Sequence, residues 1–256
     1  MLLAIDIGNT DTVVGVFDGS NLLNSFRVAS AQNLTIDEAG LFVSSLFHHH
    51  IKAELTEVTQ VAICSVVPHL TDIYKRMSKK YFKVDPLIIS SKIKLPFEIE
   101  YPKPGEIGAD RLANAAAGFA EFGSGLIVVD MGTATTFDVI SESGAYIGGV
   151  IAPGPQTAGI NLAQRAARLF EVTIEKPERV IGKSTAQALK SGLHYGTIGL
   201  IDTIVDNIFQ ELGKNCKVIA TGGAAESYIV GSKHISDYIP DLTLNGIRII
   251  ADFNSQ

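Results

Sequence analysis

Residues 2–17 read LLAIDIGNTDTVVGVF, an aliphatic run that ends at a carboxylate, Asp6, and resumes after the turn sequence GNT. Two apolar runs separated by a short Gly- and Asn-containing turn predict antiparallel strands over 2–7 and 12–17. A carboxylate at the end of a buried strand loses hydration, which is unfavourable unless a cation, a proton or hydrogen-bond donors replace the water. The stretch therefore predicts a strand hairpin with a polar site at its end.

The composition is that of a folded globular protein, with 46 % hydrophobic and 19 % charged residues among 256. The net charge of −6 and the lack of a basic cluster argue against nucleic acid as a partner. No apolar run approaches the roughly 20 residues of a membrane span, and the N-terminus lacks the basic flank of a signal peptide. Two distant cysteines, Cys64 and Cys216, exclude a disulfide framework. We expect a cytoplasmic protein that binds neither nucleic acid nor a membrane.

The chain contains an internal repeat. Aligned on Asp6 and Asp130, AIDIGNTDTVVGV and VVDMGTATTFDVI share an aliphatic pair, Asp, an apolar residue, Gly and a β-branched strand. A duplicated strand meander followed by alternating helices and strands predicts an α/β fold of two similar lobes. We place these lobes at 1–115 and 116–256, and expect Asp6 and Asp130 to reach one cleft from opposite sides.

Periodicity predicts the other elements. Further strands are expected over 22–28, 58–67, 84–90, 145–152 and 217–223, and helices over 36–47, 69–82, 111–123, 156–169, 184–212 and 224–232. We expect the helix over 184–212 to break near Gly192 or Gly196. The Pro-rich segment 95–110 predicts a long loop, and such loops in compact domains usually carry function.

The turns that follow Asp6 and Asp130, GNTDT and GTATT, combine glycine with hydroxyl side chains. Small residues let a polyphosphate approach the main chain, and a carboxylate anchors the cation that neutralises it. Either turn alone could be a plain hairpin, but the matched pair favours a phosphate site. The hydroxyls expected to donate to phosphate oxygens are those of Thr10, Thr12, Thr133, Thr135 and Thr136.

Asp110, in GEIGADRLANAAAGF, is a third candidate carboxylate. An Asp at the start of a helix commonly caps its N-terminus. Alternatively, Asp110 is a general base that takes a proton from a hydroxyl held beside Gly108 and Arg111. Position alone leaves both roles open.

Three other features have a structural and a functional interpretation. The TGGAAESY stretch at 221–228 is either a tight turn or a surface for close approach of a phosphorylated ligand. Ser184 is a good N-cap, and Thr185 beside it is either an early helical residue or a ligand contact. His48–His50 point in different directions around a helix, so we expect a solvated helix end rather than a metal site.

Several motifs together resemble the type III pantothenate kinase family. They are DIGNT at 6–10, GADR at 108–111, DMGTATTFD at 130–138, GGVIAPG at 148–154, IGKST at 181–185, SG at 191–192 and TGG at 221–223. The match runs in order along nearly the whole chain, and GADR combined with DxGTATTFD is more specific than any single motif.

The resemblance implies the actin-like ATPase fold, in which two ribonuclease H-like lobes surround a nucleotide cleft. It implies a homodimer that uses ATP to phosphorylate pantothenate to 4'-phosphopantothenate, the first step of coenzyme A synthesis. It also implies Mg²⁺ or another divalent cation with the nucleotide, and a monovalent cation, K⁺ or NH₄⁺.

The resemblance further implies individual roles, with Asp110 as the proton acceptor and Asp130 as the ligand of the monovalent cation. The ATP set is Asp6, Ile7, Gly8, Asn9, Thr10, Asp11, Thr12, Val13 and Thr133, and the pantothenate set is Tyr101, Gly108, Ala109, Asp110, Arg111 and Thr185. The chain has Asp11 and Ser184 where the family commonly has Asn, and RLFEV at 168–172 lacks the usual Leu-Pro. Asp11 adds negative charge near the phosphates.

Two other functions on this fold are open at the level of the sequence. One is a non-catalytic regulator, and the other is an ATP-dependent kinase for a sugar or a short acid. The presence of Asp6, Asp110 and Asp130 together favours catalysis.

Overall fold

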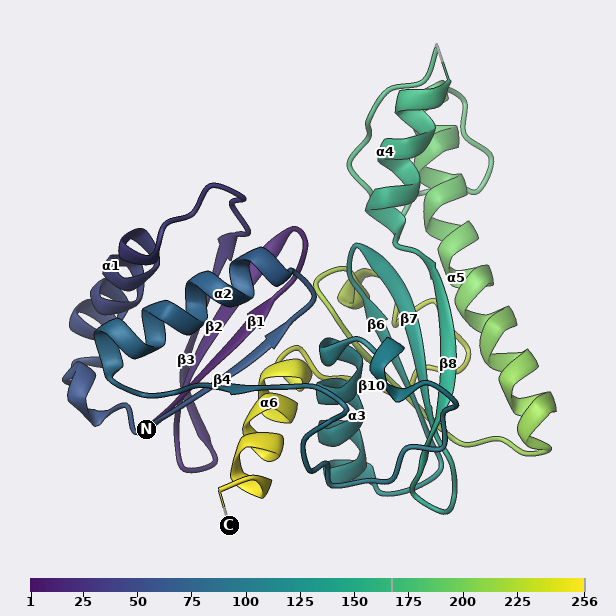
Figure 1. Ribbon diagram of the computed structural model, residues 1–256. Coiled ribbons are helices and arrows are strands. Elements are labelled where there is room, and N and C mark those ends of the chain that lie inside the picture. The colour runs from purple at the N-terminus through teal and green to yellow at the C-terminus, as the bar shows by residue number, and fades with distance from the viewer. Residues whose placement is uncertain (167, 256) are drawn as a thin grey trace. The chain divides into compact units, whose positions relative to one another are not determined.

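The computed structural model describes residues 1–166 and 168–255 (Figure 1). The chain divides into two compact units: unit 1 is Met1–Glu121 with the chain from Asp241 onward, and unit 2 is Phe122–Pro240. The sequence expectation put the boundary after residue 115 and gave the whole C-terminus to the second lobe. The structure differs because the C-terminal helix returns to pack on unit 1.

Unit 1 contains a five-stranded mixed sheet in the order β3-β2-β1-β4-β5. Its strands are β1 (Leu2–Ile7), β2 (Asp11–Asp18), β3 (Asn21–Ala29), β4 (Gln60–Ser65) and β5 (Leu87–Ile88). β1, β2 and β3 form the predicted antiparallel meander, and β4 runs parallel to β1. β4 and β5 are both shorter than their predicted ranges.

Two helices pack together beside this sheet, α1 (Ile36–Leu46) and α2 (Pro68–Met77). Thr35 begins α1 with a capping box, since its side chain accepts from the Glu38 N–H and the Glu38 side chain accepts from the Thr35 N–H. Each helix continues into one π-helical turn, at Phe47–Ile51 and Ser78–Phe82. The exposed His48–His50 lie in the π-helical turn Phe47–Ile51 at the end of α1, as expected for a solvated helix end.

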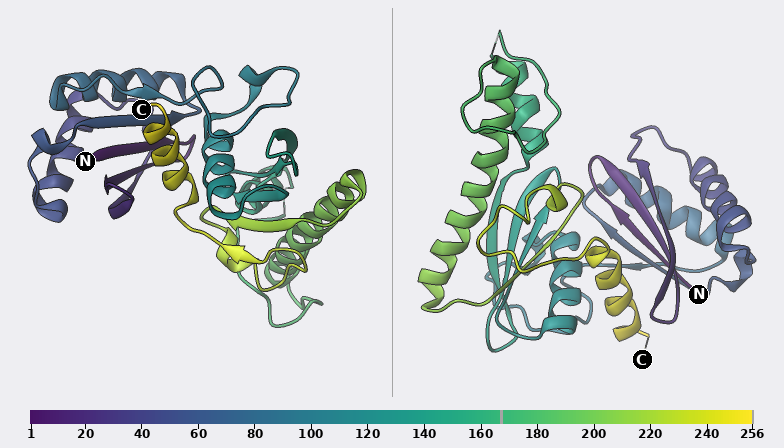
Figure 2. Two further views of the ribbon diagram at one scale, coloured as in Figure 1. Left: turned by 90° about the horizontal axis from the view of Figure 1, so that it is seen from below. Right: turned by 180° about the vertical axis from the view of Figure 1, so that it is seen from behind.

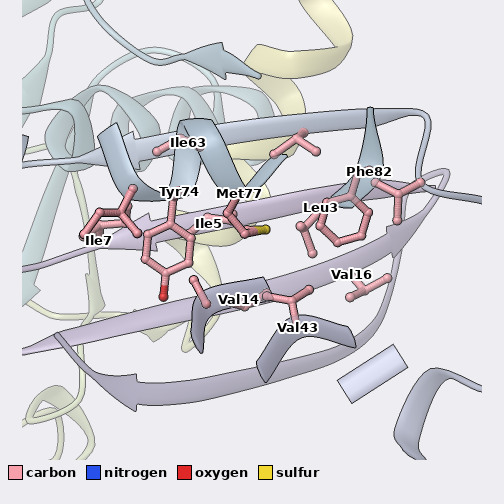
Figure 3. Close-up of a cluster of buried hydrophobic side chains, with 14 of the residues drawn as sticks. Leu3, Ile5, Ile7, Val14, Val16, Val43, Ile63, Tyr74, Met77 and Phe82 are labelled. Carbon is pink, nitrogen blue, oxygen red and sulfur yellow. The ribbon is translucent and has the colours of Figure 1, made fainter. Parts of the chain in front are cut away.

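Apolar side chains from the sheet, α1 and α2 form the core of unit 1 (Figure 3). Leu3, Ile5 and Ile7 on β1 meet Val43 of α1 and Tyr74 of α2 there. Because side chains alternate between the two faces of a strand, Asp6 lies on the opposite face from these residues.

The opposite face carries the C-terminal helix α6 (Leu242–Phe253), which packs on β1 and β4. A Cβ on Gly15 of β2 would lie 3.0 Å from Leu244, so the helix approaches the strand closely. The helix also meets α3 (Ala109–Phe122), where Thr243 donates a hydrogen bond to the Asn114 side chain at 2.7 Å. This helix is not among those predicted from the sequence, although LTLNGIRII has apolar residues at helical spacing.

Unit 2 repeats the sheet topology, in the order β10-β9-β6-β7-β8, which confirms the duplication. Its strands are β6 (Leu126–Met131), β7 (Ala134–Ile140), β8 (Tyr146–Pro153), β9 (Lys217–Thr221) and β10 (Asp237–Tyr238). The long helix α5 (Thr185–Leu212) packs on one face. α4 (Pro155–Arg165) lies beside the N-terminal half of α5, and both project beyond the sheet of unit 2 (Figures 1 and 2).

Three helix predictions in unit 2 were wrong in part. α5 runs without a break, because an interior glycine costs only about 1 kcal/mol and the side chains of Ile201 and Val205 are buried. The helix expected over 224–232 is a single 3₁₀ turn, Ala225–Ser227, because the buried Asp202 carboxylate holds the chain that follows it. α4 ends at Arg165 rather than 169, and residue 167 lies outside the described residues.

No helix within the described residues is both long enough and apolar enough to cross a lipid bilayer.

The packing of α6 predicts the effect of a single methyl group. In Gly246→Ala the added Cβ would lie 1.8 Å from the Ala113 carbonyl oxygen, so a backbone must move, and we expect a loss of about 2 kcal/mol or more in unfolding free energy. Urea denaturation followed by circular dichroism measures the change.

Gly199→Ala on α5 is the matched control, because nothing lies within 4 Å of its added Cβ. It should stabilise the protein by about 0.5–1 kcal/mol through helix propensity. Equal unfolding midpoints for the two variants would contradict the close approach of α6 to α3.

Candidate functional site

In unit 1 the candidate site begins at the turn between β1 and β2. Asp6 is the penultimate residue of β1, is half-buried, and pairs with Val13 on β2 and with Cys64 on β4. The Gly8 N–H donates to the Asp11 carbonyl at 2.9 Å and closes the turn. The tip of the turn, Asn9 and Thr10, is exposed.

Ser30, just beyond the end of β3, fixes this turn. Its N–H donates to the Thr10 carbonyl at 2.8 Å, and its hydroxyl donates to the Gly8 carbonyl at 2.7 Å. The same hydroxyl lies 2.9 Å from Thr12 Oγ1. Burial raises the pKa of the Tyr74 phenol, and a hydrogen bond with Thr12 opposes that effect. The inner side of the turn is therefore held by a chain of hydroxyl groups.

This arrangement restricts which predicted residues can offer a side chain to a ligand. The Ile7 side chain is fully buried, and its carbonyl accepts from the Val66 N–H at 3.1 Å. Thr12 is 1 % exposed, so its hydroxyl serves the turn rather than a phosphate, contrary to the sequence expectation. The side chains with solvent access are those of Asp6, Asn9, Thr10, Asp11 and Val13.

A hollow of about 490 Å³ lies beside the carboxyl end of β4. Ser65 pairs with Ile7, so the hollow adjoins the end of β1. The Thr71 hydroxyl donates to Ser65 Oγ at 2.7 Å and ties α2 to the strand. No motif in the sequence marks this segment as functional. The lining is Ser65, Val66, Pro68, Thr71, Asp72, Lys75 and Ile88.

Asp110 lies in the first turn of α3, but it is not the N-cap. The helix begins at Ala109, two residues earlier than predicted, and the Gly108 carbonyl accepts from the Leu112 N–H at 3.2 Å. Asp110 Oδ1 accepts from the Arg111 N–H at 2.8 Å. A Cβ on Gly108 would lie 2.4 Å from the same oxygen, so the Asp110 carboxylate requires glycine at position 108.

The flanking predicted residues of unit 1 differ in exposure. Tyr101 is half-buried in the loop before the 3₁₀ turn Pro104–Glu106, whereas Ala109 is buried. Arg111 is half-buried. These residues and Asp110 lie within eleven positions of one another, in unit 1.

The equivalent turn of unit 2 is one residue shorter. Gly132 N–H donates to the Ala134 carbonyl at 2.9 Å, and Asp130 pairs with Thr136. The ungapped alignment of the two repeats was therefore wrong beyond this turn. Thr135 was expected to donate its hydroxyl to a phosphate oxygen. The side chain is instead fully buried, and its hydroxyl has no hydrogen-bond partner within the protein.

Glycines bring three segments of main chain together around Asp130. A Cβ on Gly154 would lie 2.2 Å from the Gly132 carbonyl oxygen. Gly222 has a φ of +92°, and a Cβ there would lie 2.5 Å from Asp130 Oδ1. Thr157 Oγ1 donates to the Thr133 carbonyl at 2.6 Å. The TGG sequence thus forms a tight turn that places main chain against the Asp130 carboxylate.

Thr185 is the first residue of α5, and the Ser184 side chain caps the helix by accepting from the Gln187 N–H at 3.3 Å. Thr185 also lines a mostly apolar hollow of about 380 Å³ between α4 and α5. The other lining residues are Leu162, Leu169, Ala188, Leu189, Gly192 and Leu193.

No group of three His, Cys, Asp or Glu side chains suited to a metal ion occurs in residues 1–166 or 168–255. Asp6 and Asp130 are instead single carboxylates at strand ends, and each lies beside a turn that contains glycine. Such a group can share a cation with phosphate oxygens and water, which is how Mg²⁺ usually binds with nucleotides.

A family model described as type III pantothenate kinase matches residues 2–207. A type III pantothenate kinase of Dehalococcoides mccartyi strain 195 is 43 % identical over 254 residues, covering 99 % of this chain and 98 % of that protein. One from Anaeromyxobacter sp. strain Fw109-5 is 44 % identical and covers 99 % and 100 %.

Solved structures share the fold. A protein described as a Baf family transcriptional activator from Campylobacter jejuni has a TM-score of 0.62 at 22 % identity, covering 99 % of this chain and 98 % of that one. The ROK hexokinase of Thermus thermophilus has a TM-score of 0.52 at 13 % identity, with coverage of 99 % and 98 %. These likenesses identify the actin-like ATPase fold and, at such identities, the fold alone.

The hydroxyl brace predicts that Ser30→Ala loosens the turn of unit 1. The variant leaves the Gly8 carbonyl and the buried Thr12 hydroxyl without this partner, so we expect a loss of about 1–2 kcal/mol in stability. Amide hydrogen exchange should quicken at residues 8–12, and mass spectrometry measures it.

Ser30→Thr keeps the hydroxyl and should retain slow exchange. Unchanged exchange in Ser30→Ala would show that β3 does not hold the turn.

Proposed function

The chain belongs to the type III pantothenate kinase family, and we propose that it transfers the γ-phosphoryl group of ATP to the primary hydroxyl of pantothenate. The observation that carries this proposal is the identity of 43–44 % with members of that family along the whole chain. The product, 4'-phosphopantothenate, is the first intermediate of coenzyme A synthesis.

We assign the phosphates of ATP to the turn after Asp6, residues 6–13, where its main chain and the exposed Asn9 and Thr10 side chains would meet them. We assign Thr133 in unit 2 as a further ATP contact. Support comes from the exposed tip at Asn9 and Thr10, where a ligand meets main chain and hydroxyl without displacing the core. Glycine at the start of each turn keeps side-chain bulk away from the phosphates.

Cations are needed because a triphosphate and strand-end carboxylates repel one another. The donor set fits a divalent ion shared with ATP, since Mg²⁺ takes one or two carboxylates and completes its shell with phosphates and water. Asp6 would hold it, and the ion would neutralise charge on the transferred group. For Asp130 we propose a monovalent ion, K⁺ or NH₄⁺, because this carboxylate lies against the main chain of Gly222.

Asp110 is proposed as the general base. Its carboxylate is half-buried, and Gly108 leaves the space beside Oδ1 free of side-chain bulk. Taking the proton of the pantothenate hydroxyl lets that oxygen bond to the γ-phosphorus as the bond to the β-phosphate oxygen breaks and ADP leaves. Most of the rate would come from positioning and charge neutralisation.

The acceptor site is proposed to comprise Tyr101, Gly108, Ala109 and Arg111, with Thr185 as a further contact. Arg111 offers a cation for the pantothenate carboxylate. Thr185 combines a hydroxyl with an apolar hollow, which suits a ligand bearing both methyl and polar groups.

We further propose that the protein works as a cytoplasmic homodimer. Apolar side chains are exposed on α4, on the following loop and on α5, and such clusters mark interfaces. They include Ile160, Leu162, Phe170, Val180, Ile181 and Tyr195.

A charge among these exposed apolar residues should weaken the dimer. Ile181 is 83 % exposed, so Ile181→Asp cannot disturb a core, and we expect it to sediment at the monomer mass of 27.3 kDa at micromolar concentration. Val230→Asp, at an 86 % exposed position, is the control that should stay dimeric. A wild-type chain that sediments as a monomer would refute the homodimer.

Incubation with labelled ATP and pantothenate tests the reaction. We expect phosphopantothenate in the presence of Mg²⁺, with turnover rising when K⁺ is added. Asp110→Asn should lower kcat about 10²–10⁴-fold and leave ATP binding nearly unchanged, because only the base is lost.

Asp37→Asn is the matched control, since Asp37 is the second residue of α1 as Asp110 is of α3. It should keep wild-type turnover. Full activity in Asp110→Asn would refute the general base and leave Asp110 only a structural role at the start of α3. Phosphorylation of a sugar or a short acid instead of pantothenate would refute pantothenate as the acceptor.

A further inference from the structure

Arg27, on β3, is the only lysine or arginine among the first 51 residues of the chain. The three-strand meander that carries the Asp6 turn therefore has one permanently cationic side chain. A nucleotide triphosphate at this turn would meet two carboxylates, Asp6 and Asp11, and this single guanidinium. The location of Arg27 thus bears on how the phosphates are bound.

The strand register places Arg27 in the same row as Asp6. Asp6 pairs with Val13 across β1 and β2, and Val13 pairs with Arg27 across β2 and β3. Directly paired residues project from the same face of a sheet. With strands about 4.8 Å apart, the Asp6 and Arg27 backbones are separated by roughly 10 Å. Arg27 therefore projects on the Asp6 face, away from the α1 and α2 core.

An ion pair holds the guanidinium next to the turn. Arg27 Nη1 lies 3.1 Å from Asp11 Oδ2, and the two side chains are 59 % and 39 % exposed. An exposed pair of this kind contributes little to stability, at most about 1 kcal/mol. Arginine carries five N–H donors in a planar fork that matches phosphate oxygens. The pair with Asp11 thus places the guanidinium next to the turn and leaves donors for another anion.

We propose that Arg27 is a phosphate ligand of the bound nucleotide and that, without nucleotide, its guanidinium is occupied by the ion pair with Asp11. The inference rests on the proposed function, because it takes ATP to bind at the Asp6 turn. It also explains how the chain tolerates Asp11 beside a polyphosphate, since the negative charge of that side chain is already paired.

A purely structural role for Arg27 makes a different prediction. If the ion pair only braces β2 against β3, removing either partner has the same effect on nucleotide binding. If Arg27 binds phosphate, removing Arg27 weakens binding, whereas removing the Asp11 charge releases the guanidinium and does not.

The experiment measures the dissociation constants of Mg·ATP and of adenosine by calorimetry, without pantothenate. We expect Arg27→Ala to weaken ATP binding about 10-fold or more, the usual effect of losing a charged hydrogen bond, with adenosine binding within about twofold of wild type. Asp11→Asn should bind ATP as tightly as the wild type or more tightly. Lys79→Ala removes another exposed ion pair, with Asp85, whose residues do not line the hollow beside β4, and it should match the wild type.

Arg27→Ala that binds ATP like the wild type would overturn the inference, and so would an Asp11→Asn variant that loses as much affinity as Arg27→Ala. If the variants show these ATP affinities but the wild type phosphorylates no pantothenate, the proposed acceptor is refuted and the role of Arg27 stands. A chain that binds no ATP would refute both.

Discussion

A carboxylate at the end of a central strand constrains each half of this protein. Asp6 and Asp130 are the penultimate residues of β1 and β6, are half-buried, and lie on the face away from the larger apolar core. An ionised group that has lost part of its hydration needs compensating donors or cations. The adjoining turn must therefore bring main chain close, which explains the glycine that follows each strand. The same short stretch of sequence therefore specifies both the strand and the polar site at its end.

The local parts of the fold could be predicted from the sequence because their causes are local. The hairpin after residue 7 follows from two apolar runs around GNT, and the duplication follows from repetition of that pattern. The errors arose from distant partners. Asp202 captures Ser232, thirty residues along the chain, and prevents a helix there. The apolar spacing of α6 is a local signal that was overlooked, but its packing on β1 and β4 has no local signal at all.

The candidate site shows the same division. Motifs identified Asp6, Asp110 and Asp130, since each stands beside a glycine turn or a helix start. They could not identify Ser30 or show that the Thr12 hydroxyl points inward, because both depend on the register of β2 against β3. Register follows from pairing across a sheet, and a shift of one residue reverses every side chain. The one-residue difference between the two turns was invisible for the same reason.

That difference separates the two turns physically. In unit 1 the Ser30 hydroxyl and N–H hold the longer turn from β3. In unit 2 the Thr157 hydroxyl holds the shorter turn, and main chain also packs closely against it at Gly154 and Gly222. Hydroxyl contacts can rotate and exchange partners, but main chain in contact at glycine leaves no space to adjust. The turn of unit 1 therefore has more room to adjust to the phosphates proposed to bind there. The turn of unit 2 has less room, which agrees with the single cation proposed at Asp130.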